Sequence, residues 1–185
     1  TLLGGDGADL IIASEGADSN QGGTGLDTVD YSGLPVGQSI DVTLHGTTIS
    51  TVVIDNGIDQ TLGGVEHVIA TQSNDQVVGD SQQNTIQMLG GDDVIGASAG
   101  ADVLDGGAGL DTIDYSVHAT AQRVNVTLNE NMVSTVQVTG SADDDIVNIE
   151  NVVGADGDDT LIGDSQDNIL EGRLGNDILI GAGGN

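Results

Sequence analysis

A nine-residue spacing of acidic residues and their amides runs through most of this chain. At each such position stands Asp, Glu or Asn, usually with Gly two residues before it and an aliphatic residue two residues after it. The positions form three series, which are Asp9, Asp18, Asp27; Glu66, Asp75, Asn84, Asp93, Asp102, Asp111; and Glu150, Asp159, Asn168, Asp177. A short period with glycine, acid and aliphatic residue in fixed phase predicts an all-β solenoid, a parallel β-roll.

The composition of the chain agrees with metal-binding turns. It has 30 acidic residues against two arginines and no lysine, for a net charge of −28. Asp is far commoner than Glu, and Asp suits turns whereas Glu suits helices. Since 37% of the residues are hydrophobic and few are aromatic, we expect a narrow aliphatic core and bound cations that offset the repulsion between carboxylates.

The nonapeptide itself indicates which cation binds. Residues 4–12 and 106–114 both follow the pattern Gly-Gly-x-Gly-x-Asp-x-aliphatic-x. The glycines permit positive φ and a tight turn whose carbonyls point inward, and the aspartate adds a carboxylate. Such hard oxygen ligands suit Ca²⁺ better than Mg²⁺, so we expect several Ca²⁺ ions. The predicted ligand residues are Gly5, Gly7, Asp9, Asp18, Gly23, Gly25, Asp27, Asp75, Gly91, Asp93, Gly100, Asp102, Gly107, Gly109, Asp111, Gly157, Asp159, Gly175 and Asp177.

Each strand is followed by a turn, so two nonapeptides should close one coil and residues 18 apart should stack. The predicted stacks are Asp9 with Asp27, Asp75 with Asp93 and Asp111, Asn84 with Glu66 and Asp102, and Asp159 with Asp177. Several turns depart from the motif, because Asp18 lacks the following aliphatic residue, Ser73, Gln82, Asn148 and Gln166 replace a glycine, and Asn84 and Asn168 replace the acid. We expect those turns to bind weakly or not at all.

A longer repeat of 84 residues lies above the short one. Residues 22–32 recur as residues 106–116, and the correspondence continues downstream. We predict one continuous solenoid, with nonapeptide turns at 1–32, 65–116 and 149–185 and inserts at 33–64 and 117–148. Apolar residues alternate in both inserts, as in Ile40, Val42 and Leu44, so we expect longer parallel coils that extend the core and return to the roll at about 64–66 and 148–150. A hairpin packed on the side of the rod is the rival.

The repeated motif resembles the calcium-binding parallel β-roll of the RTX (repeats-in-toxin) family, and the matching phase covers roughly two-thirds of the chain. The inserts resemble those of large RTX surface and secreted proteins. This resemblance implies a segment of a longer bacterial protein, such as an adhesin or surface-layer protein. It also implies export by type I secretion and calcium-triggered folding outside the cell. The array is cut in mid-repeat at both ends, which favours the same interpretation.

Other residues have weaker functional interpretations. His45, His67 and His118 share no metal-ligand spacing, so we expect structural or surface roles. Tyr31 and Tyr115 could stack on a sugar, but covering the roll where each insert begins is the favoured role. The run 143–145 is interpreted as a solvated loop rather than an extra metal site.

The function expected is a structural calcium-binding module without catalytic residues. Alternatives are a carbohydrate-active solenoid enzyme that uses two carboxylates, and a self-assembling filament or layer subunit. A glycan, a host surface or other copies of the chain are candidate partners. The negative charge disfavours nucleic acids and anionic membranes, and no run of 18 apolar residues predicts membrane insertion.

Overall fold

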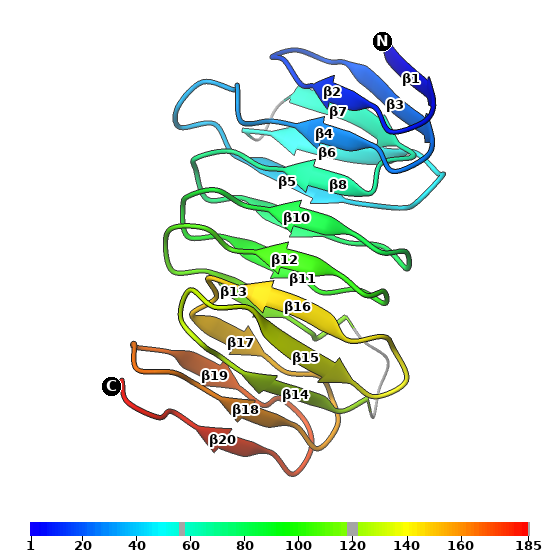
Figure 1. The fold of residues 1–185 in the computed structure, drawn as a ribbon. Helices are drawn as coiled ribbons and strands as arrows, with labels where there is room; N and C mark the ends of the chain where they lie inside the picture. The colour runs from blue at the N-terminus through cyan, green and yellow to red at the C-terminus, as the bar shows by residue number, and fades with distance from the viewer. Residues whose placement is uncertain (56–57, 118–121, 185) are drawn as a thin grey trace.

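The computed structural model describes residues 1–55, 58–117 and 122–184, and this part of the chain is built of β-strands in two facing sheets (Figure 1). The all-β solenoid prediction is confirmed. No described segment forms a helix that could span a membrane. The first sheet has the order β1 (Leu2–Asp6), β3 (Ser19–Thr24), β7 (Ile58–Gly63), β6 (Ser50–Ile54), β5 (Ile40–Thr43), β9 (Gln76–Val78), β11 (Val94–Gly96), β13 (Thr112–Asp114), β17 (Asn151–Val153) and β19 (Ile169–Glu171).

The second sheet holds the strands that alternate with these along the chain. Its order is β2 (Leu10–Ile12), β4 (Thr28–Asp30), β8 (His67–Ile69), β10 (Thr85–Gln87), β12 (Val103–Asp105), β16 (Asp144–Val147), β15 (Ser134–Val138), β14 (Val124–Thr127), β18 (Thr160–Ile162) and β20 (Ile178–Ile180). Outside the inserts the strands pair in parallel, 18 residues apart, as in Val94 with Thr112. One coil therefore consists of two nonapeptides.

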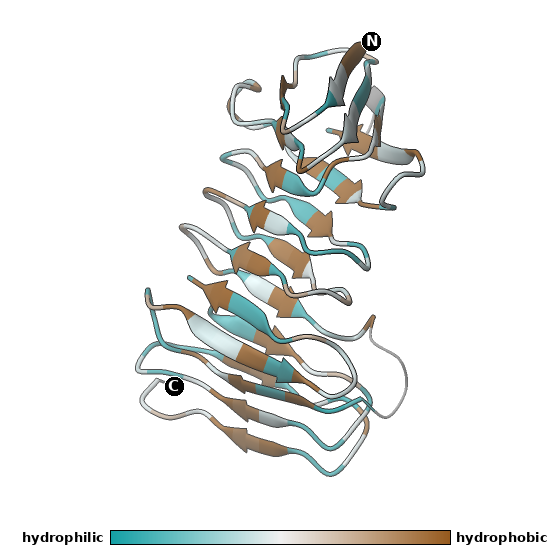
Figure 2. Cartoon of the chain, turned by 45° about the vertical axis from the view of Figure 1, so that its right-hand side comes forward, coloured by the Kyte–Doolittle hydropathy of each residue, from teal (hydrophilic) through white to brown (hydrophobic). Residues whose placement is uncertain are grey.

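The core lies between the sheets as ladders of aliphatic side chains. In each three-residue strand the middle residue points inward, because side chains alternate between the two faces of a strand. Val77, Ile95 and Ile113 stack in the first sheet, and Ile86 and Leu104 stack in the second. All five are at most 1% exposed. Figure 2 shows the corresponding apolar positions recurring from strand to strand. These ladders confirm the predicted phase of the repeat.

The expectation of longer parallel coils in the inserts is wrong. Strand β6 pairs antiparallel with both β5 and β7, and β15 pairs antiparallel with both β14 and β16. The inserts nevertheless lie within the sheets, because β5 pairs in parallel with β9 and β7 with β3. Val42 and Val126 belong to the core, at 0% and 1% exposure. Each insert is thus neither a long parallel coil nor a hairpin on the side of the rod; it adds two strands to one sheet.

The chain also rejoins the repeat earlier than predicted. Strand β7 aligns Thr61 with Ser19, and β16 aligns Ile146 with Leu104, so re-entry precedes residues 64 and 148. The first insert widens the first sheet and the second widens the second sheet. The 45 residues from Glu66 to Asp111 explain this alternation, because they make an odd number of nonapeptides and so end on the other sheet.

Candidate metal centre

The repeat acids lie at the turns and form two columns, one on each side of the roll. The first turn column precedes the strands of the second sheet and holds Asp9, Asp27, Glu66, Asn84, Asp102, Asp159 and Asp177. The second turn column precedes the strands of the first sheet and holds Asp18, Asp75, Asp93, Asp111, Glu150 and Asn168. The two columns divide the predicted ligands between opposite sides of the molecule.

Hydrogen bonds between successive coils order each column. The backbone N–H of Asp75 donates to Asp93 Oδ1 at 2.7 Å, and that of Asp93 donates to Asp111 Oδ1 at 2.9 Å. Asp9 donates in the same way to Asp27 Oδ1 at 2.8 Å. Equivalent bonds join Asn84 to Asp102 and Asp159 to Asp177. The predicted 18-residue stacking is therefore confirmed at all of these turns.

A glutamate continues each column where an insert interrupts the spacing. The N–H of Asp27 donates to Glu66 Oε2 at 2.9 Å, and that of Asp111 donates to Glu150 Oε2 at 2.8 Å. These pairs are 39 residues apart. The longer glutamate side chain keeps the carboxylate in the column after the excursion of the insert.

Asp144 is a buried member of the first turn column that the sequence interpretation missed. It is 0% exposed, and its Oδ1 accepts the N–H of Asp102 at 3.0 Å, so a solvated loop is wrong for this residue. Burial raises the pKa of Asp144 to about 7, and the charge of Asp102 raises it further, whereas the Tyr115 hydroxyl lowers it. Asp144 falls outside the nine-residue phase, but Ile146 two residues later is a local signal of the motif.

Four aspartates in these columns have a second carboxylate oxygen without a partner. The Oδ2 atoms of Asp9, Asp27, Asp93 and Asp111 accept no hydrogen bond among the described residues. Asp27, Asp93 and Asp111 are at most 1% exposed. A buried carboxylate oxygen without a donor is strongly unfavourable, so the geometry requires a positive partner at these positions.

The pKa values of two of these residues reflect the same burial. Desolvation raises the pKa of Asp93 to about 7 against the bond from Asp75, and the charges of Asp111 and Asp75 add to the rise. Desolvation raises the pKa of Asp111 to about 6, with a further rise from the charge of Glu150. Both shifts mean that the charged form is poorly compensated within the protein alone.

The glycines of these turns are required by close approach between coils. Gly25 and Gly109 have φ of 145° and 154°. A Cβ at Gly25 would overlap the carbonyl oxygen of Gly7, and one at Gly109 would overlap that of Gly91. Main-chain oxygens therefore gather beside the unpartnered carboxylates, as the sequence predicts.

The donor set fits an ion that takes oxygen ligands in irregular geometry. No group of three or more His, Cys, Asp or Glu side chains in the described ranges could hold a metal by itself. An ion would therefore combine single carboxylates with main-chain carbonyls, a set that suits Ca²⁺. In the first turn column these are the carbonyls of Gly5, Gly7, Gly23 and Gly25 with Asp9 and Asp27, and in the second those of Gly91, Gly107 and Gly109 with Asp93 and Asp111.

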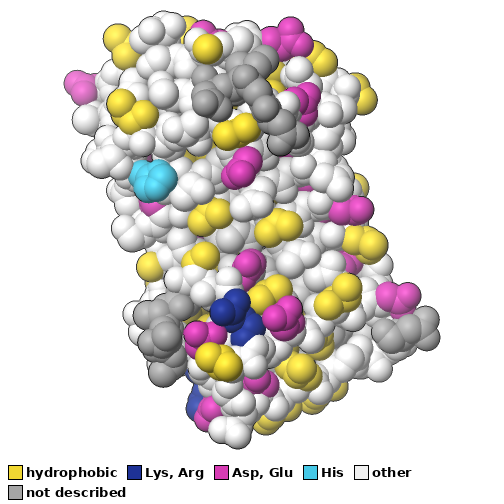
Figure 3. Space-filling view, turned by 180° about the vertical axis from the view of Figure 1, so that it is seen from behind, with side chains coloured by type: hydrophobic (Ala, Val, Ile, Leu, Met, Phe, Trp, Pro, Cys, Tyr) yellow, Lys and Arg dark blue, Asp and Glu magenta, His cyan; other side chains and the backbone are white. Residues whose placement is uncertain are grey.

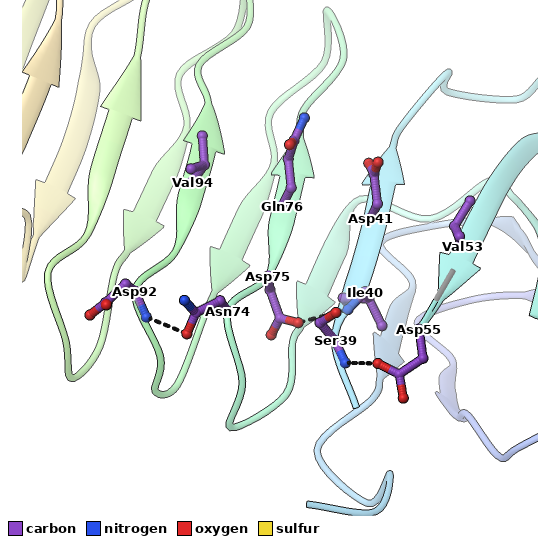
Figure 4. Close-up of a pocket in the computed structure, with 10 residues that line it drawn as sticks. All are labelled: Ser39, Ile40, Asp41, Val53, Asp55, Asn74, Asp75, Gln76, Asp92 and Val94. Atoms are coloured by element: carbon purple, nitrogen blue, oxygen red, sulfur yellow. Dashed lines mark hydrogen bonds between the residues drawn. The ribbon is translucent and has the colours of Figure 1, made fainter. Parts of the chain in front are cut away.

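The remaining predicted aspartates already have hydrogen-bond donors on both oxygens or lie near an end of the roll. Asp75 accepts the N–H of Ile40 on Oδ1 at 2.7 Å and the N–H of Thr71 on Oδ2 at 2.7 Å. Figure 4 shows the Asp75 carboxylate facing Ile40, with Asn74 and Asp92 of successive coils beside it. Asp102 and Asp159 have the same arrangement, Asp18 accepts a hydroxyl on Oδ2, and Asp177 is half-buried. Gly100, Gly157 and Gly175 lie two residues before Asp102, Asp159 and Asp177.

The histidines and tyrosines form no second site. His45 contacts Ser50, and His67 contacts Thr28, while His118 lies outside the described residues. Tyr31 and Tyr115 are both 0% exposed. Their rings pack in the core where the inserts begin, so neither ring is available to stack on a sugar.

Fold and turns together define a parallel β-roll of the ion-stabilised class, with buried carboxylates and glycine carbonyls along two turn columns. A family model described as the RTX calcium-binding nonapeptide repeat matches four segments, residues 1–31, 61–95, 89–116 and 153–185. These segments cover more than half of the chain, and the chain belongs to this family. Its nonapeptide repeats bind several Ca²⁺ ions, which are therefore the cofactor of this chain. No curated protein matched the sequence.

Proposed function

We propose that this chain is a structural calcium-binding module that folds when Ca²⁺ binds after export, within an RTX adhesin, a surface-layer protein or another secreted protein. The carrying observation is the set of partnerless carboxylate oxygens on Asp9, Asp27, Asp93 and Asp111 in a chain of net charge −28. Bound Ca²⁺ supplies positive charge and takes up these oxygens, so the folded state depends on the ion. We further propose that residues 1–185 form one continuous solenoid segment of a longer protein at the bacterial cell surface or outside the cell.

An enzymatic role has little support from the chemistry of the surface. A hollow of about 290 Å³ beside β5 and β9 is lined by Asp41, Asp55, Asp75 and Asp92, which could suggest a carboxylate pair (Figure 4). Its lining contains no Arg, Lys or aromatic residue. A glycosidase must hold and distort a sugar ring between its two carboxyl groups, which this hollow cannot do. We therefore propose a structural role for the acids.

Calorimetric titration tests this function directly. We expect Ca²⁺ to bind at several sites per chain and Mg²⁺ to fail at equal concentration, because Mg²⁺ prefers octahedral geometry and its own waters. The calcium-loaded protein should hydrolyse nothing in a polysaccharide screen, and the same screen would reveal whether a glycan binds. A host surface and other copies of the chain are the further partners to assay. Hydrolysis that disappears in the Asp41→Asn or Asp55→Asn variant would favour the enzyme instead.

A further inference from the structure

We propose that the residue four positions before each repeat aspartate decides whether that turn takes Ca²⁺ or closes on itself through hydrogen bonds. This inference rests on the proposed calcium-binding function and narrows it. It divides the turns into open turns, whose aspartate keeps a free Oδ2, and closed turns, whose Oδ2 accepts a bond from that fourth preceding residue. Only the open turns bind an ion.

In the closed turns, the fourth preceding residue donates to the position where an ion would bind. Thr71 donates its N–H to Asp75 Oδ2 at 2.7 Å and its hydroxyl at 2.9 Å. The N–H of Ala155 donates to Asp159 Oδ2 at 2.8 Å. Hydroxyl donors serve the other two turns, with Ser14 bound to Asp18 at 3.0 Å and Ser98 to Asp102 at 3.1 Å. These donors satisfy the carboxylate without a cation.

The two asparagine turns are closed in the same way. The N–H of Asp80 donates to Asn84 Oδ1 at 2.8 Å, and that of Asp164 donates to Asn168 Oδ1 at 2.9 Å. The Asn168 amide also donates to the carbonyl of Glu150 at 2.9 Å. A neutral side chain therefore completes the closed turn and needs no metal.

Backbone conformation distinguishes the open turns. The residues four before Asp9, Asp27, Asp93 and Asp111 are Gly5, Gly23, Leu89 and Gly107, with φ of 118°, 122°, 70° and 95°. Positive φ reorients the peptide, and no N–H from these residues satisfies the aspartate Oδ2. Leu89 is the most informative, because a leucine with positive φ is uncommon and must be held there by its surroundings. Arg173 before Asp177 also has positive φ, at 62°.

The glycine nearer to the acid does not distinguish the two kinds of turn. Gly16 and Gly100, two residues before Asp18 and Asp102, have φ of 111° and 155°. Both belong to closed turns. A glycine at this nearer position is therefore insufficient for calcium, and the more distant position carries the decision.

The open turns occur as two stacked pairs at equivalent places in the long repeat. Asp9 and Asp27 form the pair in the first turn column, and Asp93 and Asp111 form the pair in the second. The two pairs are 84 residues apart, and each is followed by a glutamate that accepts the N–H of its second aspartate. Calcium is thereby concentrated on opposite sides of the roll, next to the start of each insert.

A matched pair of substitutions tests this rule by the number of ions bound. Asp111→Asn removes a carboxylate from an open turn, and Asp102→Asn removes one from a closed turn, where Asn84 and Asn168 show that an amide fits. At saturating Ca²⁺, with circular dichroism to verify folding, calorimetry should show that Asp111→Asn loses at least one ion. Asp102→Asn should bind as many ions as the unsubstituted chain.

A gain of binding provides the second arm, which stands even if Asp111→Asn fails to fold. Thr71→Gly combined with Ser73→Gly removes the hydroxyl and permits positive φ at both turn positions, so the number of bound ions should rise. An unchanged number there, or a loss in Asp102→Asn equal to that in Asp111→Asn, would overturn the rule while leaving calcium binding intact. If the unsubstituted chain binds no Ca²⁺, the proposed function itself fails and the rule falls with it.

Discussion

At the scale of single residues, the buried carboxylates make this fold dependent on its solvent ions. Asp93 is 1% exposed and Asp111 is 0% exposed, and each has one oxygen bound to a backbone N–H and one without a donor. Burial without compensation raises both pKa values, so protons and Ca²⁺ compete for the same oxygens. The state of these few atoms controls whether the coils can stack.

Asp93→Ala should weaken calcium-dependent folding far more than Asp18→Ala. Asp93 lies between the turns of Asp75 and Asp111 and has a free oxygen, whereas the Asp18 Oδ2 is bound to the Ser14 hydroxyl. Losing one ion site at a Ca²⁺ concentration of about 100 times Kd removes about 2.7 kcal/mol. Losing the exposed hydroxyl bond should cost less than about 1 kcal/mol. Calcium titration followed by circular dichroism compares the midpoints, and equal shifts would contradict the account.

Acid should favour folding when calcium is absent. The folded pKa values of Asp93 and Asp111, about 7 and about 6, lie above the ordinary value of 3.8. Their protonation therefore stabilises the folded state, fully at pH below 3.8 and progressively less as pH rises through 6 to 7. In calcium-depleted buffer, the far-ultraviolet signal of β-structure should increase as the pH falls through this range. Asp93→Asn should shift the transition, and loss of structure on acidification would refute the assignment.

At the scale of elements, the turns set how closely coils approach and the inserts set which sheet grows. Gly109 stands against the carbonyl of Gly91 in the preceding coil, so the turn leaves no room for a side chain. Strands β5 and β6, and later β14 and β15, use the same aliphatic core as the repeats. Turns and inserts together keep the two sheets equal in strand number within the described residues.

Gly109→Ala should destabilise the calcium-loaded protein, whereas Gly33→Ala should be nearly neutral. Gly109 has φ of 154° and an added Cβ would overlap main-chain oxygen, while nothing lies within 4 Å of a Cβ at Gly33. Non-glycine residues with positive φ cost roughly 1–2 kcal/mol, and the overlap adds to this. Most surface substitutions stay within about 0.5 kcal/mol. Urea unfolding at fixed Ca²⁺ measures both changes, and two equal values would show that this close approach is unimportant.

The sequence predicted the regular part of the roll because its period is fixed by side-chain phase. Ile95 and Ile113 could be assigned to one ladder, since inward residues must recur every 18 positions. The direction of the insert strands could not be predicted, because Ile40 and Val42 alternate identically in parallel and antiparallel pairing. Asp144 was missed for a related reason, as antiparallel excursions break the nine-residue count before it.

At the scale of the whole molecule, charge is the dominant problem of this fold. The chain has a net charge of −28, and its two arginines already pair with acids, Arg123 with Asp158 at 3.8 Å and Arg173 with Asp156 at 3.1 Å. Figure 3 shows acidic side chains spread over one face, with basic groups only toward the C-terminal end. Internal ion pairs therefore cannot offset the repulsion, and the compact state needs cations from solution.

Circular dichroism with and without Ca²⁺ tests this central claim most directly. The account predicts that the chain is largely disordered in chelator. It should fold cooperatively as Ca²⁺ reaches roughly 10⁻⁴–10⁻³ M, the range of extracellular modules. Above Kd, each tenfold increase in Ca²⁺ should add about 1.4 kcal/mol per site to the free energy of unfolding, because the ion binds the folded state. A β-sheet spectrum that is identical in chelator and in saturating Ca²⁺ would contradict the account.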